Sequence, residues 1–394
     1  MNKQFLKLLY YFTPMFFILC ERTGGLMFQI NHSGIKHVIV VFACACGLIS
    51  LPKPKYTRFN WELKYILFAS VFLYVVSIFF QLYNQSFKSY SLKEFYFLIT
   101  PIIFIYCLFN IFSRKELERW MDAMFYFTSF IFVGKYVLMQ YSDFTMSGFI
   151  QMFNWRNLIL ESVSPLGSES DTGVLMMIFD FYYIFKNDKR KIIIASLLTF
   201  FGYKRFVCLF MILFLIISPY ISRGKKPKYY LVVSTIVLFL FLPSTVYIMC
   251  TDEFAFWFES KYDVDFNEFT MTRFYIVNMV IDANLTNYGL GTVTHYLEVL
   301  GNEGQTNMHN DILRIYMETT IIGSIVFTYC FFKIASKNIF SYFLMLFMFV
   351  ELYLAHFLGP ATIIFWIFVY YNIFYFNSEL ILKTPSRKKF LWWH

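Results

Sequence analysis

The sequence has 394 residues, of which 58% are hydrophobic and only 15% are charged. No soluble core of this size needs apolar runs along its whole length, so the composition excludes an ordinary soluble protein and indicates a membrane protein. The formal net charge of +9 would also suit a nucleic-acid-binding protein, and the positions of the basic residues must decide between the two.

Twelve apolar segments are each predicted to cross the membrane as a helix, at about 20 residues per crossing with shorter spans tolerated. In chain order they are 5–20, 35–51, 63–83, 92–112, 120–141, 170–186, 191–203, 206–222, 229–250, 312–332, 339–357 and 360–377. The first is followed by Glu21-Arg22 and further spans, so we interpret it as a retained span and not as a cleaved signal. The predicted fold class is an all-α polytopic membrane protein.

The basic residues are unevenly divided between the two sides of this arrangement. With the N-terminus in the cytoplasm, the inner segments hold 23 of the 34 lysines and arginines. Such an excess is typical of cytoplasmic loops, and it predicts that both termini are cytoplasmic and that the protein is a multi-pass protein of the bacterial inner membrane. The net charge is then a topology signal, and a nucleic-acid partner is not expected.

Two predicted external segments, 142–169 and 251–311, are too long to be simple turns. The expected organisation is therefore nine spans in 1–250, a large periplasmic loop in 251–311, and three spans with a basic cytoplasmic tail in 312–394. Within the large loop, the apolar spacing from Phe266 to Ala283 predicts an amphipathic helix that lies on the membrane or over a cavity.

The strongest local signal is Met308-His309-Asn310-Asp311, where the polar loop enters a predicted span. Asn310 is a good N-cap for that helix. His309 would lie at the water interface, where a neutral imidazole can take a proton from a hydroxyl nucleophile. The alternative is that His309 only hydrogen-bonds the loop.

The run that begins at His309 resembles the H-N-x-x-L-x-x-x-x-E-x-G-x-x-G pattern of the O-antigen polymerase and O-antigen ligase superfamily of lipid-linked glycan transferases. Three further matches follow the family's order: Lys204-Arg205 between short spans, Arg273 at the start of the loop helix, and the turn Asn287-Tyr288-Gly289-Leu290-Gly291 after it. The resemblance covers about residues 165–335. Thr320 departs from it, because the family commonly has a glycine there.

The resemblance implies a GT-C-like fold and inverting transfer of an undecaprenyl-pyrophosphate-linked glycan to a sugar hydroxyl, outside the membrane, with no metal and no cofactor. His309 would be the general base. Arg205 and Arg273, helped by Lys204, would stabilise the pyrophosphate leaving group, because guanidinium groups bind such oxygens bidentately. The alternatives are interfacial snorkelling for Arg205 and capping or solvation of the loop helix for Arg273.

Four further residues are expected to support this site: Asn310, Arg314, Glu318 and His295. His295 is a weaker second candidate for the base, and we favour loop structure for it. Glu318 follows Arg314 by four residues, so an intrahelical ion pair is its simplest interpretation, ahead of a role in orienting the site.

Other ionisable residues have structural explanations. Asp263-Val264-Asp265 has the D-x-D form of metal-dependent transferases, but we interpret it as a solvated turn. Lys135 and Asp180 lie at similar depths on consecutive spans, and we predict that they pair within the membrane; the alternative is that one of them lines a cavity for the lipid-linked glycan. The seven cysteines lie within or at the ends of apolar runs, which favours packing roles.

The preferred hypothesis is an O-antigen, or related surface-polysaccharide, polymerase that joins one lipid-linked glycan to another. An O-antigen ligase with a lipid A-core acceptor would use the same residues. A lipid-linked oligosaccharide flippase is a third hypothesis, although transporters usually bind near the midplane and have short loops. The expected partners are the donor and acceptor glycolipids, membrane lipid and, as a candidate, a chain-length regulator protein.

Overall fold

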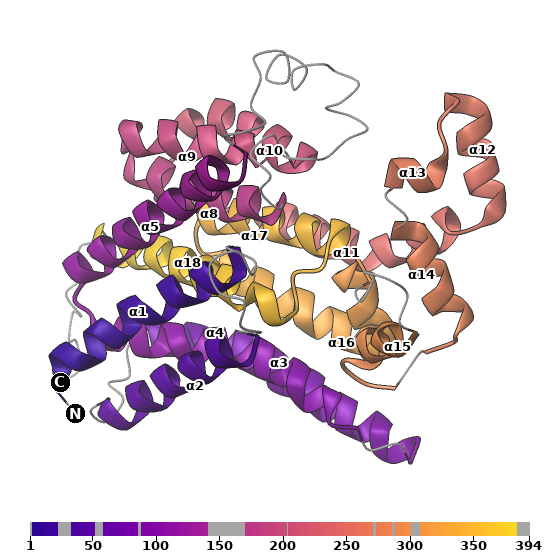
Figure 1. Cartoon of the computed structure of the whole chain (residues 1–394), viewed down its shortest axis with the longest axis horizontal. Coiled ribbons are helices and arrows are strands. Elements are labelled where there is room, and N and C mark those ends of the chain that lie inside the picture. The colour runs from indigo at the N-terminus through magenta and orange to yellow at the C-terminus, as the bar shows by residue number, and fades with distance from the viewer. Residues whose placement is uncertain are drawn as a thin grey trace, which may run out of the picture.

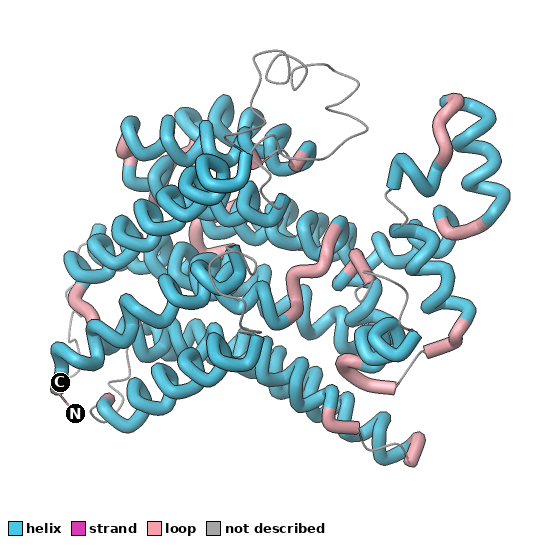
Figure 2. Tube along the Cα trace, in the orientation of Figure 1, coloured by secondary structure: helices cyan, strands magenta, loops and turns pink. Residues whose placement is uncertain are grey.

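The computed structural model describes residues 2–22, 33–51, 58–85, 88–140, 170–202, 204–270, 273–285, 288–300 and 308–383. Across these ranges the chain forms helices joined by turns and contains no strand, as Figures 1 and 2 show. The predicted all-α class is confirmed.

A helix is present at each of the twelve segments where a span is predicted. They are α1 (Lys3–Arg22), α2 (Ser33–Ser50), α3 (Arg58–Tyr83), α4 (Tyr90–Ile111), α5 (Arg114–Gln140), α8 (Ser170–Lys186), α9 (Lys189–Phe201), α10 (Arg205–Ile217), α11 (Tyr229–Met249), α16 (Asp311–Ala335), α17 (Ile339–Leu354) and α18 (Ile363–Lys383). Short 3₁₀ turns, η1 (Ser218–Tyr220) and η2 (Pro360–Thr362), follow α10 and precede α18.

Helix boundaries differ from the prediction where polar residues form the first turn. The fifth helix was expected from residue 120 but begins at Arg114, because Ser113 and Glu116 cap it. Glu116 accepts hydrogen bonds from the backbone N–H of Ser113 at 2.8 Å and from its hydroxyl at 2.9 Å. A charged, capped turn extends a helix beyond its apolar segment.

Several helices have the length and composition of membrane spans. Four described stretches qualify: Glu62–Tyr83, Tyr90–Ile111, Tyr229–Met249 and Asp311–Ala335. The remaining apolar helices include shorter ones such as Ile339–Leu354. Large apolar side chains point outward from the bundle, including Ile49 at 84% exposure and Phe241 at 67%. Outward apolar surface on this scale is expected where lipid is the solvent, and the chain is a membrane protein.

The core of the bundle is built around α8 and α18. Both helices are buried on every side over most of their length, and α18 packs against α4, α8 and α17. Aromatic rings fill the spaces between them; Trp120 stacks on Tyr371 with ring centroids 5.4 Å apart, and Tyr371 stacks on Tyr375 at 5.9 Å. The helices α8, α16, α17 and α18 therefore form a rigid support for whatever lies at their ends.

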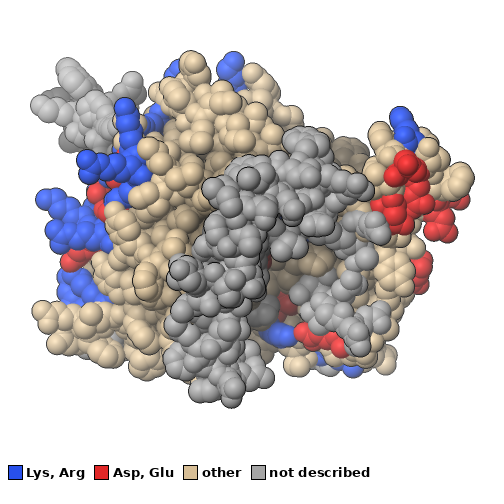
Figure 3. All heavy atoms as spheres, turned by 45° about the horizontal axis from the view of Figure 1, so that its top comes forward, with Lys and Arg blue, Asp and Glu red and all other residues tan. Residues whose placement is uncertain are grey.

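The large predicted loop is itself mostly helical. It contains α12 (Asp252–Tyr262), α13 (Phe266–Thr270), α14 (Arg273–Asp282) and α15 (Thr292–Leu300). The single amphipathic helix predicted from Phe266 to Ala283 is wrong in detail, because α13 and α14 are separate helices. Helices α12 and α13 project from the bundle in Figure 1, and acidic side chains gather on this side of the molecule in Figure 3. The other long segment, 142–169, lies outside the described residues.

The predicted glycine turn after α14 is confirmed. Gly289 and Gly291 have φ values of +94° and +81°, which favour glycine. The turn docks on two helices: Leu290 N donates to Ser77 Oγ on α3 at 2.9 Å, and Gly289 N donates to the carbonyl of Glu318 on α16 at 3.1 Å. A Cβ atom at Gly289 would lie 3.0 Å from Ser77. The turn thereby ties the large loop to the helix that follows it.

Helix α16 is broken at Thr320. This residue has φ 64° and ψ −179°, a conformation that is almost confined to glycine. The helix resumes after it, and Gly323 provides room for the side chain of Thr319, whose Oγ1 would lie 2.1 Å from a Cβ atom at position 323. The position at which the sequence departs from the pattern that it resembles is therefore a strained position in the structure.

Candidate functional site

Five of the predicted site residues line a single cavity of about 380 Å³: Lys204, Arg205, Arg273, His309 and Asn310. They come from the start of α10, the start of α14 and the segment that enters α16. The ends of α11 and α17 close the cavity from the bundle side. Separate parts of the chain thus bring cations and a histidine to one place.

Aromatic rings make up much of the wall of this cavity. Phe254, Phe258, Phe266 and Phe269 of α12 and α13 line it, together with Phe274 of α14. These rings contact one another; Phe258 and Phe266, for example, have centroids 5.1 Å apart. The cavity therefore combines cationic side chains with apolar rings, including those of the projecting helices, which suits an amphiphilic ligand.

Arg273 is held in place by the end of α17. Its Nη1 donates to the carbonyl oxygen of Leu354 at 2.7 Å. Burial lowers the pKa of Arg273 from its ordinary value, and nearby Arg205 acts in the same direction, whereas Glu351 opposes the change. An arginine stays charged under such a shift. The hydrogen bond to Leu354 fixes the guanidinium beside the cavity and leaves its other N–H donors available.

Lys204 is paired within the protein. Its ammonium forms an ion pair with the fully buried carboxylate of Glu351 and lies 3.8 Å from Asp171. It also lies 4.9 Å from the ring centroid of Phe357, over its face. The predicted auxiliary cation is thus balanced by carboxylates. Glu351, a costly residue for a span, is explained by this pair.

His309 is half-buried at the cavity wall. Burial, together with the positive charges of Arg273 and His356, lowers the pKa of His309 from 6.5 to about 4. The imidazole is therefore neutral at pH 7, and a neutral imidazole has a lone pair with which to accept a proton.

Asn310 is the N-cap of α16, as the sequence predicts. Its Oδ1 accepts a hydrogen bond from the backbone N–H of Leu313 at 2.9 Å. This bond fixes the angle at which the loop enters the helix. His309, the preceding residue, is held at the helix N-terminus as a result.

Arg314 does not form the predicted ion pair with Glu318. Its Nη1 lies 3.1 Å from Glu94 of α4, and its Nε lies 3.0 Å from Asp311. Its Nη2 donates to the carbonyl of Leu358 at 2.8 Å. The prediction was wrong because it considered only partners of Arg314 on its own helix. The fold brings a different carboxylate, Glu94 of α4, to Arg314.

Glu318 instead links two helices. Its Oε1 accepts the backbone N–H of Val293 at 3.0 Å, in the first turn of α15. A carboxylate at a helix N-terminus is favourable there, because unpaired N–H groups point toward it. Glu318 therefore holds α15, and the loop around it, to α16.

His295 is not brought to the cavity. It is exposed on α15, and its ring stacks on Tyr90 with centroids 5.0 Å apart. This placement agrees with the interpretation of His295 as loop structure and separates it from the other predicted site residues.

The segment between α17 and α18 was not singled out by the sequence, yet it borders the site. The carboxylate of Asp311 accepts hydrogen bonds from the backbone N–H groups of Phe357 and, at 2.8 Å, of Leu358. His356 Nδ1 lies 2.9 Å from Asp311 Oδ1. No motif marks a pair 45 residues apart. The available signal was a histidine close before Gly359-Pro360, which ends a helix.

Two further predictions concern residues elsewhere. Asp180 accepts hydrogen bonds from Ser196 and Thr199, each at 3.0 Å, while the side chain of Lys135, its predicted partner, lies outside the description. Asp263 is the C-cap of α12 in a left-handed conformation, which agrees with a turn. Within the described ranges, no group of three or more His, Cys, Asp or Glu side chains could hold a metal ion.

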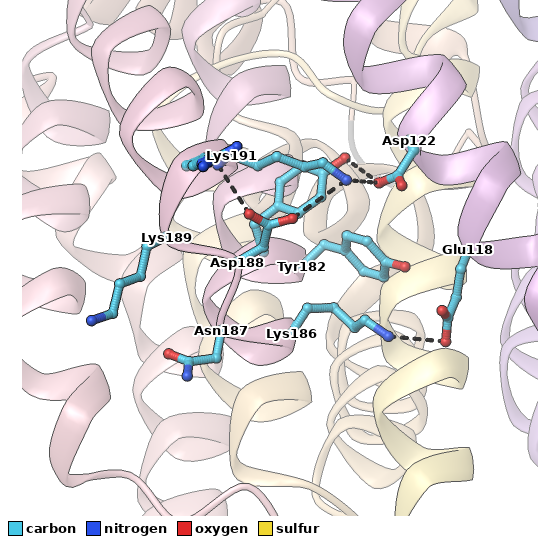
Figure 4. A pocket seen from close by; sticks show the side chains of 10 residues that line it. Glu118, Asp122, Tyr182, Lys186, Asn187, Asp188, Lys189 and Lys191 are labelled. Carbon is cyan, nitrogen blue, oxygen red and sulfur yellow. Dashed lines mark hydrogen bonds and ion pairs between the residues drawn. The ribbon is translucent and has the colours of Figure 1, made fainter.

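A second cavity, of about 520 Å³, lies around the turn between α8 and α9. Figure 4 shows several of its charged side chains paired: Lys186 with Glu118 at 2.9 Å, and Lys191 with Asp122 at 2.7 Å and Asp188 at 3.4 Å. We interpret these pairs as structural links between α5, α8 and α9.

The two cavities lie at opposite ends of α8. Asp171, in its first turn, is near Lys204, whereas Lys186, its last residue, lines the second cavity. A helix of 17 residues rises about 25 Å, which approaches the thickness of a bilayer core.

No protein-family model matches the chain, and no curated protein or solved structure is significantly similar to it. By its fold and composition the protein is a helical membrane protein with a cation-lined and aromatic cavity at one end of the bundle.

Proposed function

We propose that the protein is a membrane glycosyltransferase that moves a glycan from an undecaprenyl-pyrophosphate carrier to a sugar hydroxyl, and that it acts as a surface-polysaccharide polymerase. The observation that carries the proposal is that Arg205, Arg273 and His309 line one cavity. The sequence resemblance assigns these same residues to the leaving group and the base.

In the proposed reaction, the acceptor hydroxyl attacks the anomeric carbon of the donor sugar while its proton passes to the neutral imidazole of His309. The new bond joins the acceptor oxygen to the anomeric carbon, and the bond from that carbon to the pyrophosphate oxygen breaks. Arg205 and Arg273 stabilise the charge that develops on the departing undecaprenyl pyrophosphate. Attack opposite the leaving group inverts the anomeric configuration.

The aromatic wall supports a lipid-linked substrate. Phe254, Phe258, Phe266 and Phe269 give the cavity apolar surface in addition to its cations. A prenyl chain and a pyrophosphate are joined in the carrier, and one cavity with both kinds of surface can hold the junction between them. In the proposed topology this cavity opens on the periplasmic side.

The test is glycan transfer by the purified protein in nanodiscs, with the undecaprenyl-pyrophosphate-linked repeat unit of the source strain as substrate. His309→Ala is expected to lose at least about 100-fold in rate, because a positioned base contributes on the order of 10² to 10⁴. His295→Ala, which removes an exposed histidine outside the cavity, is the matched control and should keep the wild-type rate. Equal rates for His309→Ala and wild type would refute the proposal.

The acceptor is identified by the surface-polysaccharide profile of a deletion strain. A lipid A-core carrying a single repeat unit indicates a missing polymerase, as proposed. An uncapped core together with long chains on undecaprenyl pyrophosphate would instead indicate a missing ligase. An unchanged profile would contradict both activities.

A further inference from the structure

We infer that residues 354–358 form a frame that holds the base and the leaving-group cation in one geometry, with His356 acting through Asp311 as a positioning residue for His309. The inference rests on the proposed function, because it names how the residues of that site are kept in place. We call this segment the 354–358 frame.

The frame contacts the two cations at Leu354 and at Phe357. The carbonyl of Leu354 accepts the hydrogen bond from Arg273 at 2.7 Å. The ring of Phe357 lies under the ammonium of Lys204 at 4.9 Å. The leaving-group cation on α14 is therefore attached directly to the end of α17.

The C-terminal part of the frame, Phe357 and Leu358, also holds the segment that carries the base. Asp311, two residues after His309, is fully buried and accepts the N–H groups of Phe357 and Leu358. Arg314 reinforces the junction, since it lies 3.0 Å from Asp311 and donates to the carbonyl of Leu358. A buried carboxylate with this many donors has little freedom to move, so the start of α16 and the frame form one unit.

His356 completes the coordination of Asp311. Its Nδ1 lies 2.9 Å from Asp311 Oδ1, so the proton on Nδ1 points to the carboxylate. The opposite edge of the ring lies over Gly359, where a Cβ atom would be 2.4 Å from His356 Nε2. With only 11% of its side chain exposed, the ring is fixed at both edges.

Asp311 and His356 also act on His309 through their charges, in opposite directions. The carboxylate of Asp311 raises the pKa of His309, whereas positive charge on His356 lowers it. Other charges lie near His309 on each neighbouring element. Lys204, Arg205 and Arg273 line the same cavity. Asp171 of α8 and Glu351 of α17 pair with Lys204, and Arg314 of α16 lies 3.0 Å from Asp311.

At low pH, kcat/KM falls as His309 becomes protonated, and we call this part of the pH profile the acid limb. Two substitutions should move the acid limb in opposite directions. His356→Ala leaves the carboxylate of Asp311 less compensated, so the pKa of His309 rises and the limb moves to higher pH. Asp311→Asn removes the negative charge, so the limb moves to lower pH. A substitution that merely damaged the fold would lower the rate without producing shifts of opposite sign.

The experiment measures kcat/KM against pH in the nanodisc transfer assay, for wild type, His356→Ala, His356→Asn, Asp311→Asn and the control His295→Ala. We expect His356→Ala to lose about 10- to 100-fold, the scale of a misplacement on the order of 1 Å. His356→Asn keeps a side-chain N–H donor for Asp311 and should recover most of this loss. Thermal unfolding of each variant separates lost positioning from lost fold.

The outcomes distinguish this inference from the proposed function. If His309→Ala is inactive but His356→Ala keeps the wild-type rate and pH profile, the frame inference is overturned and the transferase proposal stands. If His356→Asn is no better than His356→Ala, the hydrogen bond to Asp311 is not the link, and the inference also fails. If His309→Ala is fully active, both fail.

Discussion

At the scale of single residues, the protonation of His309 sets the expected pH dependence. Its folded-state pKa lies near 4, below the ordinary 6.5, because burial and Arg273 disfavour the charged form. The base is therefore available throughout the neutral range and is lost as the pH falls through about 4. We expect kcat/KM for glycan transfer to be flat around pH 7 and to fall in that acid region.

Binding of the donor should move the acid limb of the pH profile to higher pH. A pyrophosphate at Arg205 and Arg273 brings negative charge close to His309 and raises its pKa. The limb in kcat, which reports the complex, is then expected at higher pH than the limb in kcat/KM, which reports the free enzyme. Identical limbs would mean that the pyrophosphate does not bind beside His309.

Arg273 should be poorly replaced by lysine. One of its N–H groups is bound to the carbonyl of Leu354, and the remaining donors of the planar fork are left for phosphate oxygens. Arg273→Lys keeps the charge but not this division of donors, and we expect undecaprenyl pyrophosphate to bind about 10- to 100-fold more weakly. Arg190→Lys, an exposed arginine on α9, is the control and should leave binding unchanged. Unaltered affinity of Arg273→Lys would show that charge alone suffices.

At the scale of elements, Thr320 gives a prediction about α16. A non-glycine residue with φ 64° and ψ −179° is strained, by roughly 1–3 kcal/mol. Thr320→Gly removes the strain at a smaller cost in chain entropy and should stabilise the protein by about 1 kcal/mol. Thr328→Gly, in a regular part of the same helix, should destabilise it by a similar amount. Thermal unfolding in detergent measures both, and a less stable Thr320→Gly would contradict the account.

Apolar runs locate twelve helices, because length and composition are enough to define each of them. The same criterion misses α12 and α15, which are short and mixed in polarity, and joins α13 to α14. It also places the start of the fifth helix too late, since capping by Ser113 and Glu116 is a matter of polar hydrogen bonds and not of hydropathy.

The site was predictable in part. His309 and Asn310 could be found because a capped helix start is a local pattern, and Arg205 and Arg273 because a family resemblance marks them. The partners of Arg314 and Asp311 could not be found, because Glu94 and His356 approach them only through the packing of α4 and the turn after α17. Hydrogen bonds between residues far apart in the chain follow no fixed spacing, so no sequence pattern predicts them.

At the scale of the whole molecule, the two ends of α8 should lie on opposite sides of the membrane. Lys189, exposed beside the second cavity, and Tyr262, 52% exposed at the end of α12, mark these ends. With a membrane-impermeant maleimide, Tyr262→Cys is expected to react in intact spheroplasts and Lys189→Cys only after permeabilisation. Labelling of the unsubstituted protein measures the reaction of its native cysteines and is subtracted. Labelling of both positions from one side would refute the proposed topology.

Short outer helices also have a consequence for the surrounding lipid. Helices α9 and α10 have 13 residues each, about 20 Å of rise, and turn Ile193, Leu197, Leu209 and Ile216 outward. The hydrocarbon core of a bilayer is about 30 Å thick, which exceeds the length of these helices. Local thinning of the bilayer reduces this hydrophobic mismatch. The bilayer should then be thinnest beside α10, which begins at Arg205. A thinner bilayer there would shorten the distance that the pyrophosphate of a lipid carrier moves to reach the cavity.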